Sequence, residues 1–138
     1  MSQYCQYSDL VNLIDAVNLA AISNDYDSSQ PVNLTVINAI CTQASNACDA
    51  YVASIYLTPF NPVPKTILQA SIIFAAEICQ QRRLTPEEKN MFKSQADMWR
   101  DRLQKIGSGQ LPLDATFARQ VSPVTYKSII NRANTNIF

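Results

Sequence analysis

Glycine is nearly absent from this chain of 138 residues, in which only Gly107 and Gly109 occur. Tight hairpin turns depend on glycine for backbone angles that other residues avoid, so a sheet-rich fold with many turns is not expected. Loops that cradle phosphates or dinucleotides also need several glycines, because the backbone must approach the phosphate closely. The chain is therefore expected to be all-α and to lack such nucleotide-binding loops.

Seven prolines divide the sequence into segments in which apolar residues recur at helical spacing. The pattern predicts a four-helix bundle, with helices at about 8–21, from the cap Asn33 to about 55, at about 65–83, and from the cap Thr85 to about 106. The third helix is apolar on nearly all sides, so it should lie at the centre of the core or in a contact between subunits. The apolar spacing of the other helices also predicts buried stripes, which include Leu10, Leu13, Ile14 and Val17 in the first, Ala47 in the second and Trp99 in the fourth.

The segments between and within these helices give four further expectations. Ser8 should cap the first helix, the proline-rich stretch 58–64 should be a stiff non-helical connector, and Gly107 should end the last helix in a left-handed conformation. The pairs Lys93–Asp97 and Asp101–Lys105 have the i, i+4 spacing of ion pairs on an exposed helix face.

The residues available for chemistry are few. The chain has no histidine, which excludes a Ser-His-Asp triad, a His-assisted cysteine nucleophile and any His metal site. The gap from Cys41 to Cys48 is too wide for a zinc knuckle, and these two cysteines and Cys79 fall on predicted apolar faces, as buried free thiols do. No carboxylate pair suits acid–base or two-metal catalysis. An enzyme, a metal site and a cofactor are therefore not expected.

Features of membrane and secreted proteins are also missing from the sequence. No stretch of about 18 apolar residues is present, so no membrane span is expected. The first residues lack the basic start and apolar run of a signal peptide, which argues against Sec-type secretion.

The neutral total charge hides an asymmetry along the chain. Residues 1–64 contain five acidic residues and no lysine or arginine, whereas residues 65–138 contain eleven basic and six acidic residues. Two interpretations stay open: the halves attract each other within one fold, or the protein is a subunit with an acidic and a basic face, suited to stacking or ring assembly.

The basic residues of the third and fourth predicted helices form a candidate contact surface, for another subunit or for DNA. Acidic residues are interspersed among them, which favours a solvated, ion-paired face, and no aromatic residues are interleaved as in nucleic-acid readers. Phosphate contact stays open. The residues singled out are Arg82, Arg83, Lys89, Lys93 and Arg100.

The last 25 residues, 114–138, break the helical pattern yet carry many large apolar side chains. We call this segment the C-terminal arm and residues 1–113 the helical domain. The arm either folds back onto its own core or docks on another subunit, and fully extended it would reach roughly 80 Å. Buried apolar groups carry most interface energy. The candidate docking residues are Tyr126, Ile129, Ile130, Arg132, Ile137 and Phe138.

Several motifs, in this order, resemble a known family. They are Tyr7-Ser8-Asp9-Leu10; the helix ending at residues 47–56, with Asp49-Ala50-Tyr51-Val52; the connector Leu57-Thr58-Pro59 through Pro62-Val63-Pro64; the pair Arg82-Arg83; and Ala96-Asp97-Met98-Trp99 through Leu103, Ile106, Gly109 and Leu113. Over about residues 4–113 the chain resembles the small helical head–tail connector (neck adaptor, or head-completion) proteins of Mu-like tailed phages. Ser54-Ile55 stands where that family often has arginine.

The resemblance implies a structural virion protein without an active site or cofactor. Members form a ring, usually of twelve copies, below the portal protein, with DNA passing through the lumen without sequence specificity and other neck or tail-completion proteins as partners. It implies a place in the virion neck after assembly in the host cytoplasm. The arm would then dock on the portal or on a neighbouring subunit.

Two other functions stay open. The chain can be a stand-alone helical module that contacts nucleic acid through the basic region of the third and fourth helices, which predicts salt-sensitive DNA affinity. An unrecognised enzyme with a reactive cysteine would instead have a thiol of low pKa.

Overall fold

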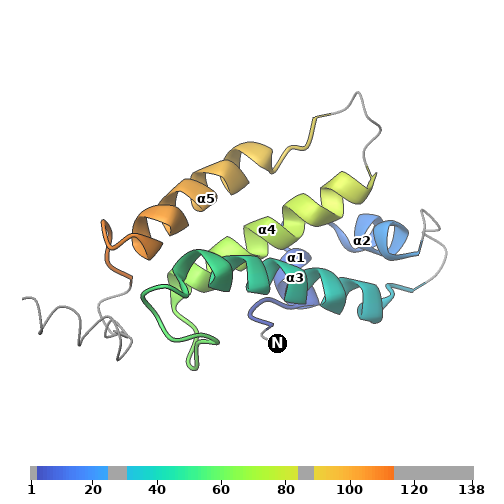
Figure 1. Cartoon of the computed structure of the whole chain (residues 1–138). Coiled ribbons are helices and arrows are strands. Elements are labelled where there is room, and N and C mark those ends of the chain that lie inside the picture. The colour runs from blue at the N-terminus through green and yellow to red at the C-terminus, as the bar shows by residue number, and fades with distance from the viewer. Residues whose placement is uncertain (1–2, 25–30, 84–88, 114–138) are drawn as a thin grey trace, which may run out of the picture.

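The computed structural model describes residues 3–24, 31–83 and 89–113. Within these ranges the chain forms helices and no strands, which confirms the all-α prediction (Figure 1). The helices are α1 (Tyr7–Leu10), α2 (Ala16–Ser23), α3 (Leu34–Val52), α4 (Lys65–Arg83) and α5 (Lys93–Gly107).

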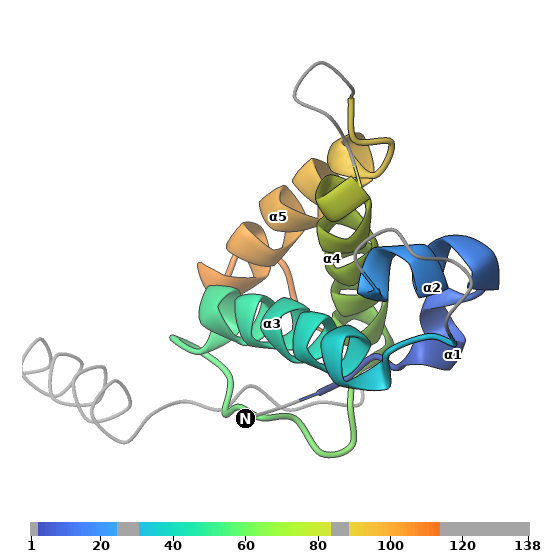
Figure 2. The same ribbon diagram turned by 90° about the vertical axis from the view of Figure 1, so that its right-hand side faces the viewer.

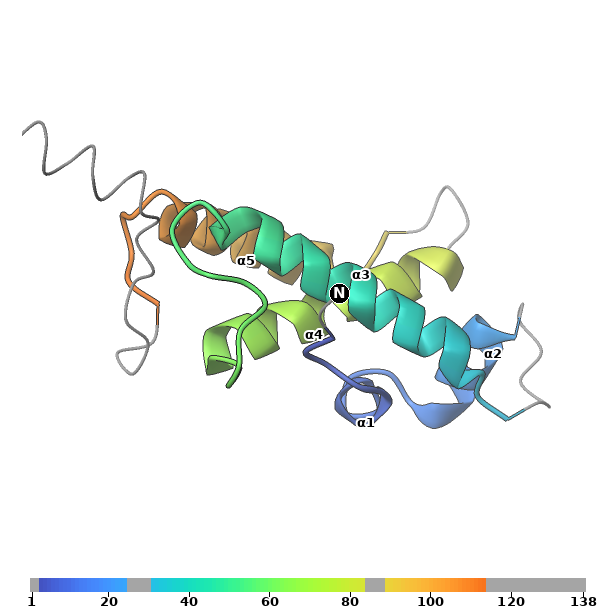
Figure 3. The same cartoon turned by 60° about the horizontal axis from the view of Figure 1, so that its bottom comes forward.

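Helix α4 lies at the centre of the molecule. It packs against each of the other four helices, whereas α5 packs against α3 and α4 but not against α1 or α2. As a result, α5 and the pair α1–α2 lie on opposite sides of α4 (Figures 2 and 3). Because other helices pack against it on several sides, α4 is apolar on nearly all sides. The predicted position of this helix at the centre of the core is confirmed.

The segment predicted as one helix over 8–21 is in fact two short helices, α1 and α2. Asp15 interrupts it: its backbone is extended, and its carboxylate accepts a hydrogen bond from the Asn18 backbone N–H at 2.8 Å, so it caps α2. The expected cap Ser8 is also wrong. Helix α1 follows Gln6, whose backbone N–H donates to the Asp9 carboxylate at 2.9 Å.

The break changes which apolar side chains are buried. Leu10 and Ile14 lie in the core as the helical pattern predicts, but Leu13 and Val17 from the same predicted stripe are exposed. A new helix that starts at Asp15 turns its side chains in a different direction from α1. The break therefore leaves two large apolar side chains on the surface.

Helix α3 begins as predicted, because the Asn33 side chain accepts hydrogen bonds from the backbone N–H groups of Thr35 and Val36. Its buried face includes one polar residue, Ser45, which donates to the Cys41 carbonyl at 2.7 Å and accepts from the Tyr4 backbone N–H at 2.8 Å. The extended segment before α1 is thereby attached to the middle of α3. Ala47, assigned to the apolar stripe by spacing, is exposed.

The connector between α3 and α4 is non-helical from Leu57 to Pro64, as its prolines predict. Two tyrosine hydroxyls hold it in place. The Tyr4 hydroxyl donates to Asp49 at 2.6 Å and accepts from the Phe60 backbone N–H at 3.0 Å. The Tyr56 hydroxyl accepts from the backbone N–H of Leu113 at 3.2 Å, which fixes the last described residue beside the connector.

The last helix differs from its prediction at both ends. It begins at Lys93, after a turn in which the Asn90 side chain accepts from the Phe92 backbone N–H at 2.9 Å; the expected cap Thr85 lies outside the described residues. At the other end the left-handed glycine is Gly109, with φ 87°, not Gly107. Gly107 is the last helical residue and meets α3 so closely that a Cβ there would lie 1.9 Å from the Tyr51 carbonyl oxygen.

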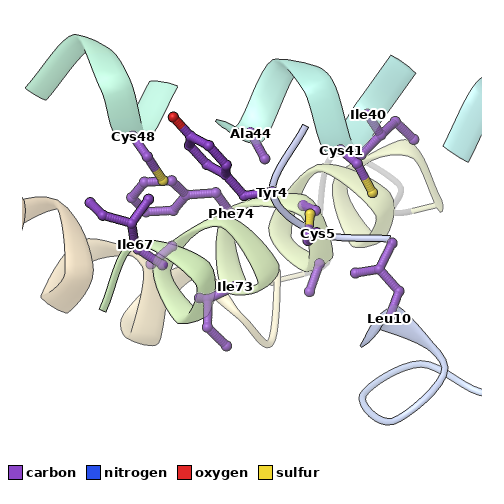
Figure 4. Packing of buried hydrophobic residues seen from close by; sticks show 14 of the residues in the cluster. Tyr4, Cys5, Leu10, Ile40, Cys41, Ala44, Cys48, Ile67, Ile73 and Phe74 are labelled. Carbon is purple, nitrogen blue, oxygen red and sulfur yellow. The ribbon is translucent and has the colours of Figure 1, made fainter. Parts of the chain in front are cut away.

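One hydrophobic core joins all five helices, the connector and Leu113. Figure 4 shows Cys5, Cys41 and Cys48 within it, among side chains of α3, α4 and the segment before α1. All four cysteines are buried free thiols, which confirms the prediction made for Cys41, Cys48 and Cys79. No helix among the described residues is long and apolar enough to cross a membrane.

Candidate functional site

The predicted basic residues cluster near the end of α4 and along α5. Arg82 is exposed near the C-terminus of α4, whose last residue is Arg83. Lys89 is exposed in the segment before α5, and the ammonium of Lys93 on α5 lies 3.3 Å from the Asp97 carboxylate. The predicted pairs Lys93–Asp97 and Asp101–Lys105 are both present, the second at 3.2 Å.

Arg100 has a structural position that the sequence did not reveal. Its guanidinium pairs with Glu77 of α4 and, at 2.6 Å, with Asp97, and it lies over the Phe74 ring at 5.4 Å from the centroid. Burial would lower the pKa of Arg100, but the hydrogen bond and charge of Glu77, followed by those of Asp97, raise it overall. Arg100 therefore joins α5 to α4 within the subunit.

A polar groove lies where α4 ends and α5 begins. It encloses about 610 Å³ and is lined by Gln81, Lys89, Asn90, Lys93, Ser94 and Asp97. Asn90 closes one side of it by donating from its amide to the Glu77 carbonyl at 2.8 Å and to the Gln81 side chain at 3.3 Å. Hydrogen bonds from Lys93 and then Arg100 lower the pKa of Asp97. The Asp97 carboxylate therefore adds a negative charge to the groove that Lys89 and Lys93 also line.

A second groove, more apolar, lies on α4 between α1 and α5. We call it the α4 groove. It has a volume of about 310 Å³, and it stays open because α5 does not pack against α1 or α2. Its lining is Asp9, Asn12, Leu13, Gln69, Ile72, Ile73 and Trp99.

Sequence reasoning missed the α4 groove. Leu13 and Trp99 were both assigned to buried stripes, but Leu13 is 41% exposed and Trp99 is half-buried. The groove depends on where α5 lies relative to α1, and periodicity within a helix carries no such information. Asp9 and Asn12, two polar residues before the break at Asp15, are the features of the sequence that could have indicated a solvent-facing surface there.

The candidate docking residues of the arm, Tyr126, Ile129, Ile130, Arg132, Ile137 and Phe138, lie outside the described residues. What the structure does describe is the point at which the arm begins. Leu113 is buried and is held by the Tyr56 hydroxyl. The last described residue is therefore fixed beside the connector between α3 and α4.

The described residues contain no group of three Cys, Asp or Glu side chains placed to hold a metal ion. Burial raises the pKa of the Cys48 thiol, and it raises that of Cys79 to about 12. A hydrogen bond with Cys5, followed by burial, raises the pKa of Cys41. These thiols are arranged as core side chains and not as ligands.

The fold defines a small all-helical protein built around one central helix, with an apolar groove on one side of that helix and a basic end. Residues 4–130 match the family model described as Bacteriophage Mu, Gp36. The chain belongs to this family and is a protein of the Mu-like phage type. The match runs past Leu113 into the arm and includes three of its candidate docking residues, Tyr126, Ile129 and Ile130. No curated protein matches the chain.

Proposed function

We propose that this protein is a structural head–tail connector, an adaptor that forms a ring below the portal and links capsid to tail around the DNA channel. The observation that carries the proposal is the family match over residues 4–130, which joins the helical core and most of the arm in one pattern. A ring closes when one surface of each copy binds a different surface of the next copy. The chain offers two such surfaces, the arm and the grooved helical domain.

In this proposal the architecture is a four-helix bundle, residues 1–113, with an extended arm, residues 114–138. Helices α1 and α2 together act as one interrupted member beside α3, α4 and α5. The single core shared by all five helices supports this division. So does the fixed position of Leu113, because it separates the helical domain from the arm at a defined point.

The proposed partners are identical copies in a ring of twelve, the portal, and other neck or tail-completion proteins. DNA passes through the lumen without base-specific contact. The place of action is the virion neck, and assembly takes place in the host cytoplasm. No catalytic residue, cofactor or metal is assigned, and the arm carries the contacts to the portal or to the adjacent subunit.

The proposal is tested by mixing the full-length protein with the portal of the same phage and imaging the product by negative-stain electron microscopy. An additional ring of density at one end of the portal is expected. The matched control is the double variant Ile129→Asp, Ile130→Asp, which removes two apolar anchors of the arm and leaves residues 1–113 unchanged. Portals that stay bare with the wild-type chain would contradict the connector function.

Contact with nucleic acid through the basic region is the second candidate. The polar groove favours nucleic-acid contact, because the side chains of two lysines, Lys89 and Lys93, line it. Asp97 in the same groove and the pairing of Arg100 with Glu77 count against it. A titration with duplex DNA at two salt concentrations decides: phosphate binding must weaken steeply as salt rises, whereas a connector without a DNA-binding site shows no affinity for short duplexes.

A further inference from the structure

We propose that the α4 groove is the acceptor site for the C-terminal arm of a neighbouring copy of this chain. The inference rests on the proposed ring and deepens it, since it names the two surfaces that meet between adjacent subunits. It is carried by the shape and chemistry of the groove, by the composition of the arm, and by the position at which the arm begins.

The groove has the character of a docking site for apolar side chains. Its apolar lining consists of Ile72 and Ile73 of α4, Leu13 after α1 and Trp99 of α5. Trp99 is held in place from outside the groove by Arg102, whose guanidinium lies 5.3 Å from the centre of the indole ring. A partly buried tryptophan beside aliphatic side chains is typical of the sites that dominate binding energy in protein interfaces.

Exposed apolar side chains also occur at the break between α1 and α2. Val11 and Val17, on either side of Leu13 in the chain, are 36% and 64% exposed. One continuous helix over this segment would have turned Leu13 and Val17 toward the core. The break at Asp15 therefore leaves apolar residues exposed on both sides of the groove residue Leu13 in the chain.

The arm has the composition that such a groove requires. Residues 126–130 of the arm read Tyr-Lys-Ser-Ile-Ile, and Ile137 and Phe138 end the chain. A pair of adjacent isoleucines with an aromatic residue three positions before them can supply several apolar anchors within a short segment. The arm is thus the one segment outside the described structure that is long and apolar enough to fill the groove.

The arm and the α1 side of the groove carry opposite charges. The arm contains three basic residues, Arg119, Lys127 and Arg132, against one acidic residue, Asp114. The groove is lined by Asp9, and Asp15 lies at the adjoining break. No lysine or arginine occurs anywhere before Lys65. Opposite charge at the rim guides the approach of the arm and fixes its orientation.

The need for ring closure selects a neighbouring copy over the same chain as the source of the arm. A closed ring requires two different surfaces on each copy, one of which binds the other on the next subunit. An arm folded into its own groove would cover both surfaces at once and leave nothing to join the subunits. Leu113 fixes the start of the arm beside the connector, and about 25 residues can extend roughly 80 Å from there, enough to cross onto a neighbour.

The test uses full-length chains and a short bis-maleimide cross-linker. One chain carries Leu13→Cys at the groove and the other carries Ser128→Cys in the arm, and the two are mixed and allowed to assemble. The native thiols are buried and serve as the unreactive background. A cross-linked dimer is expected in about tenfold excess over the same mixture made with Leu34→Cys, because docking raises the effective concentration of the two thiols. Leu34 is a matched control, since it is 50% exposed at the start of α3, away from the groove.

A second pair of variants separates docking from folding. Leu13→Asp places a charge on an exposed side chain of the groove and is expected to abolish self-association while the thermal unfolding midpoint stays unchanged. Leu34→Asp is expected to leave self-association intact. Equal assembly by both variants would overturn the inference.

The remaining outcomes are also decisive. A ring that forms without the Leu13–Ser128 cross-link overturns the inference and leaves the connector function standing. A cross-link within the Leu13→Cys, Ser128→Cys double variant when it is diluted into excess wild-type chain overturns it in favour of an arm folded onto its own groove. If neighbouring copies make no contact with each other, either in the free protein or on the portal, the inference is overturned too, and portal binding then decides the proposed function independently.

Discussion

At the scale of single residues, Gly107 shows how a side chain that is absent can determine packing. The C-terminal end of α5 meets the C-terminal end of α3 at this position, and the Ser54 hydroxyl donates to the Gly107 carbonyl at 2.9 Å. A Cβ at Gly107 would lie 1.9 Å from a backbone oxygen, which cannot move aside as the end of a side chain can. The hydrogen bond from the Ser54 hydroxyl reinforces the same junction.

Gly107→Ala is therefore expected to lower the free energy of unfolding by about 3 kcal/mol, at the upper end of overpacking costs. The neighbouring exposed Ser108→Ala is the control and should change it by less than about 0.5 kcal/mol. Urea denaturation followed by circular dichroism measures both. Equal stability of the two variants would show that α5 does not approach α3 this closely.

Arg100 is the residue for which sequence and structure suggest different roles. The sequence placed it among candidate contacts for DNA or another subunit, and the structure places it between Glu77 and Asp97. Arg100→Met should cost about 1–3 kcal/mol, because it leaves the largely buried Glu77 carboxylate without its cationic partner. Lys93→Met, which removes an exposed ion pair, should cost at most about 0.5 kcal/mol. Chemical denaturation of both variants gives the comparison, and equal losses would contradict a structural role for Arg100.

The cysteines give a further prediction at this scale. Because all four thiols are buried and so kept from reagents in the folded protein, it should react with an aromatic disulfide reagent only as fast as it unfolds. All four thiols should react at once in denaturant. The variant Met98→Cys, on an exposed position of α5, should add one fast thiol and so validates the assay. A fast thiol in the wild-type protein would instead favour cysteine chemistry.

At the scale of secondary-structure elements, Asp15 determines the form of the N-terminal region. Its side chain caps α2, which starts a new helix where the apolar spacing predicted a continuous one. Asp15→Ala should cost about 1 kcal/mol, whereas Asp15→Asn should retain most of the stability, since asparagine caps equally well. Thermal unfolding of the two variants checks the difference. If they unfold alike, the capping hydrogen bond does not stabilise the break.

The elements predicted well from sequence are those whose own side chains determine them. Helix α3 has a capping asparagine and a long regular apolar stripe, and α4 starts after a proline and is apolar on nearly all sides over most of its length; both appear close to their predicted bounds. The break at Asp15 was missed because Leu13 and Val17 maintain the helical period across it. The role of Gly107 and the existence of the α4 groove depend on contacts between elements far apart in the chain, which local patterns do not contain.

At the scale of the whole molecule, the charge asymmetry of the sequence can be reconsidered. Of the described acidic residues before Lys65, Asp9 lies in α1, Asp15 directly before α2 and Asp49 in α3. Lys93, Arg100 and Lys105 pair with carboxylates of α4 and α5. These three pairs lie within the second half of the chain, so they are not attractions between the acidic and the basic half.

The central claim is that this protein assembles as a ring with the portal. Native mass spectrometry of the full-length chain, alone and mixed with the portal of the same phage, tests it most directly. The account predicts a ring-sized species, or a monomer that joins the portal in equal copy number. A monomer or dimer whose mass is unchanged by the portal would contradict it.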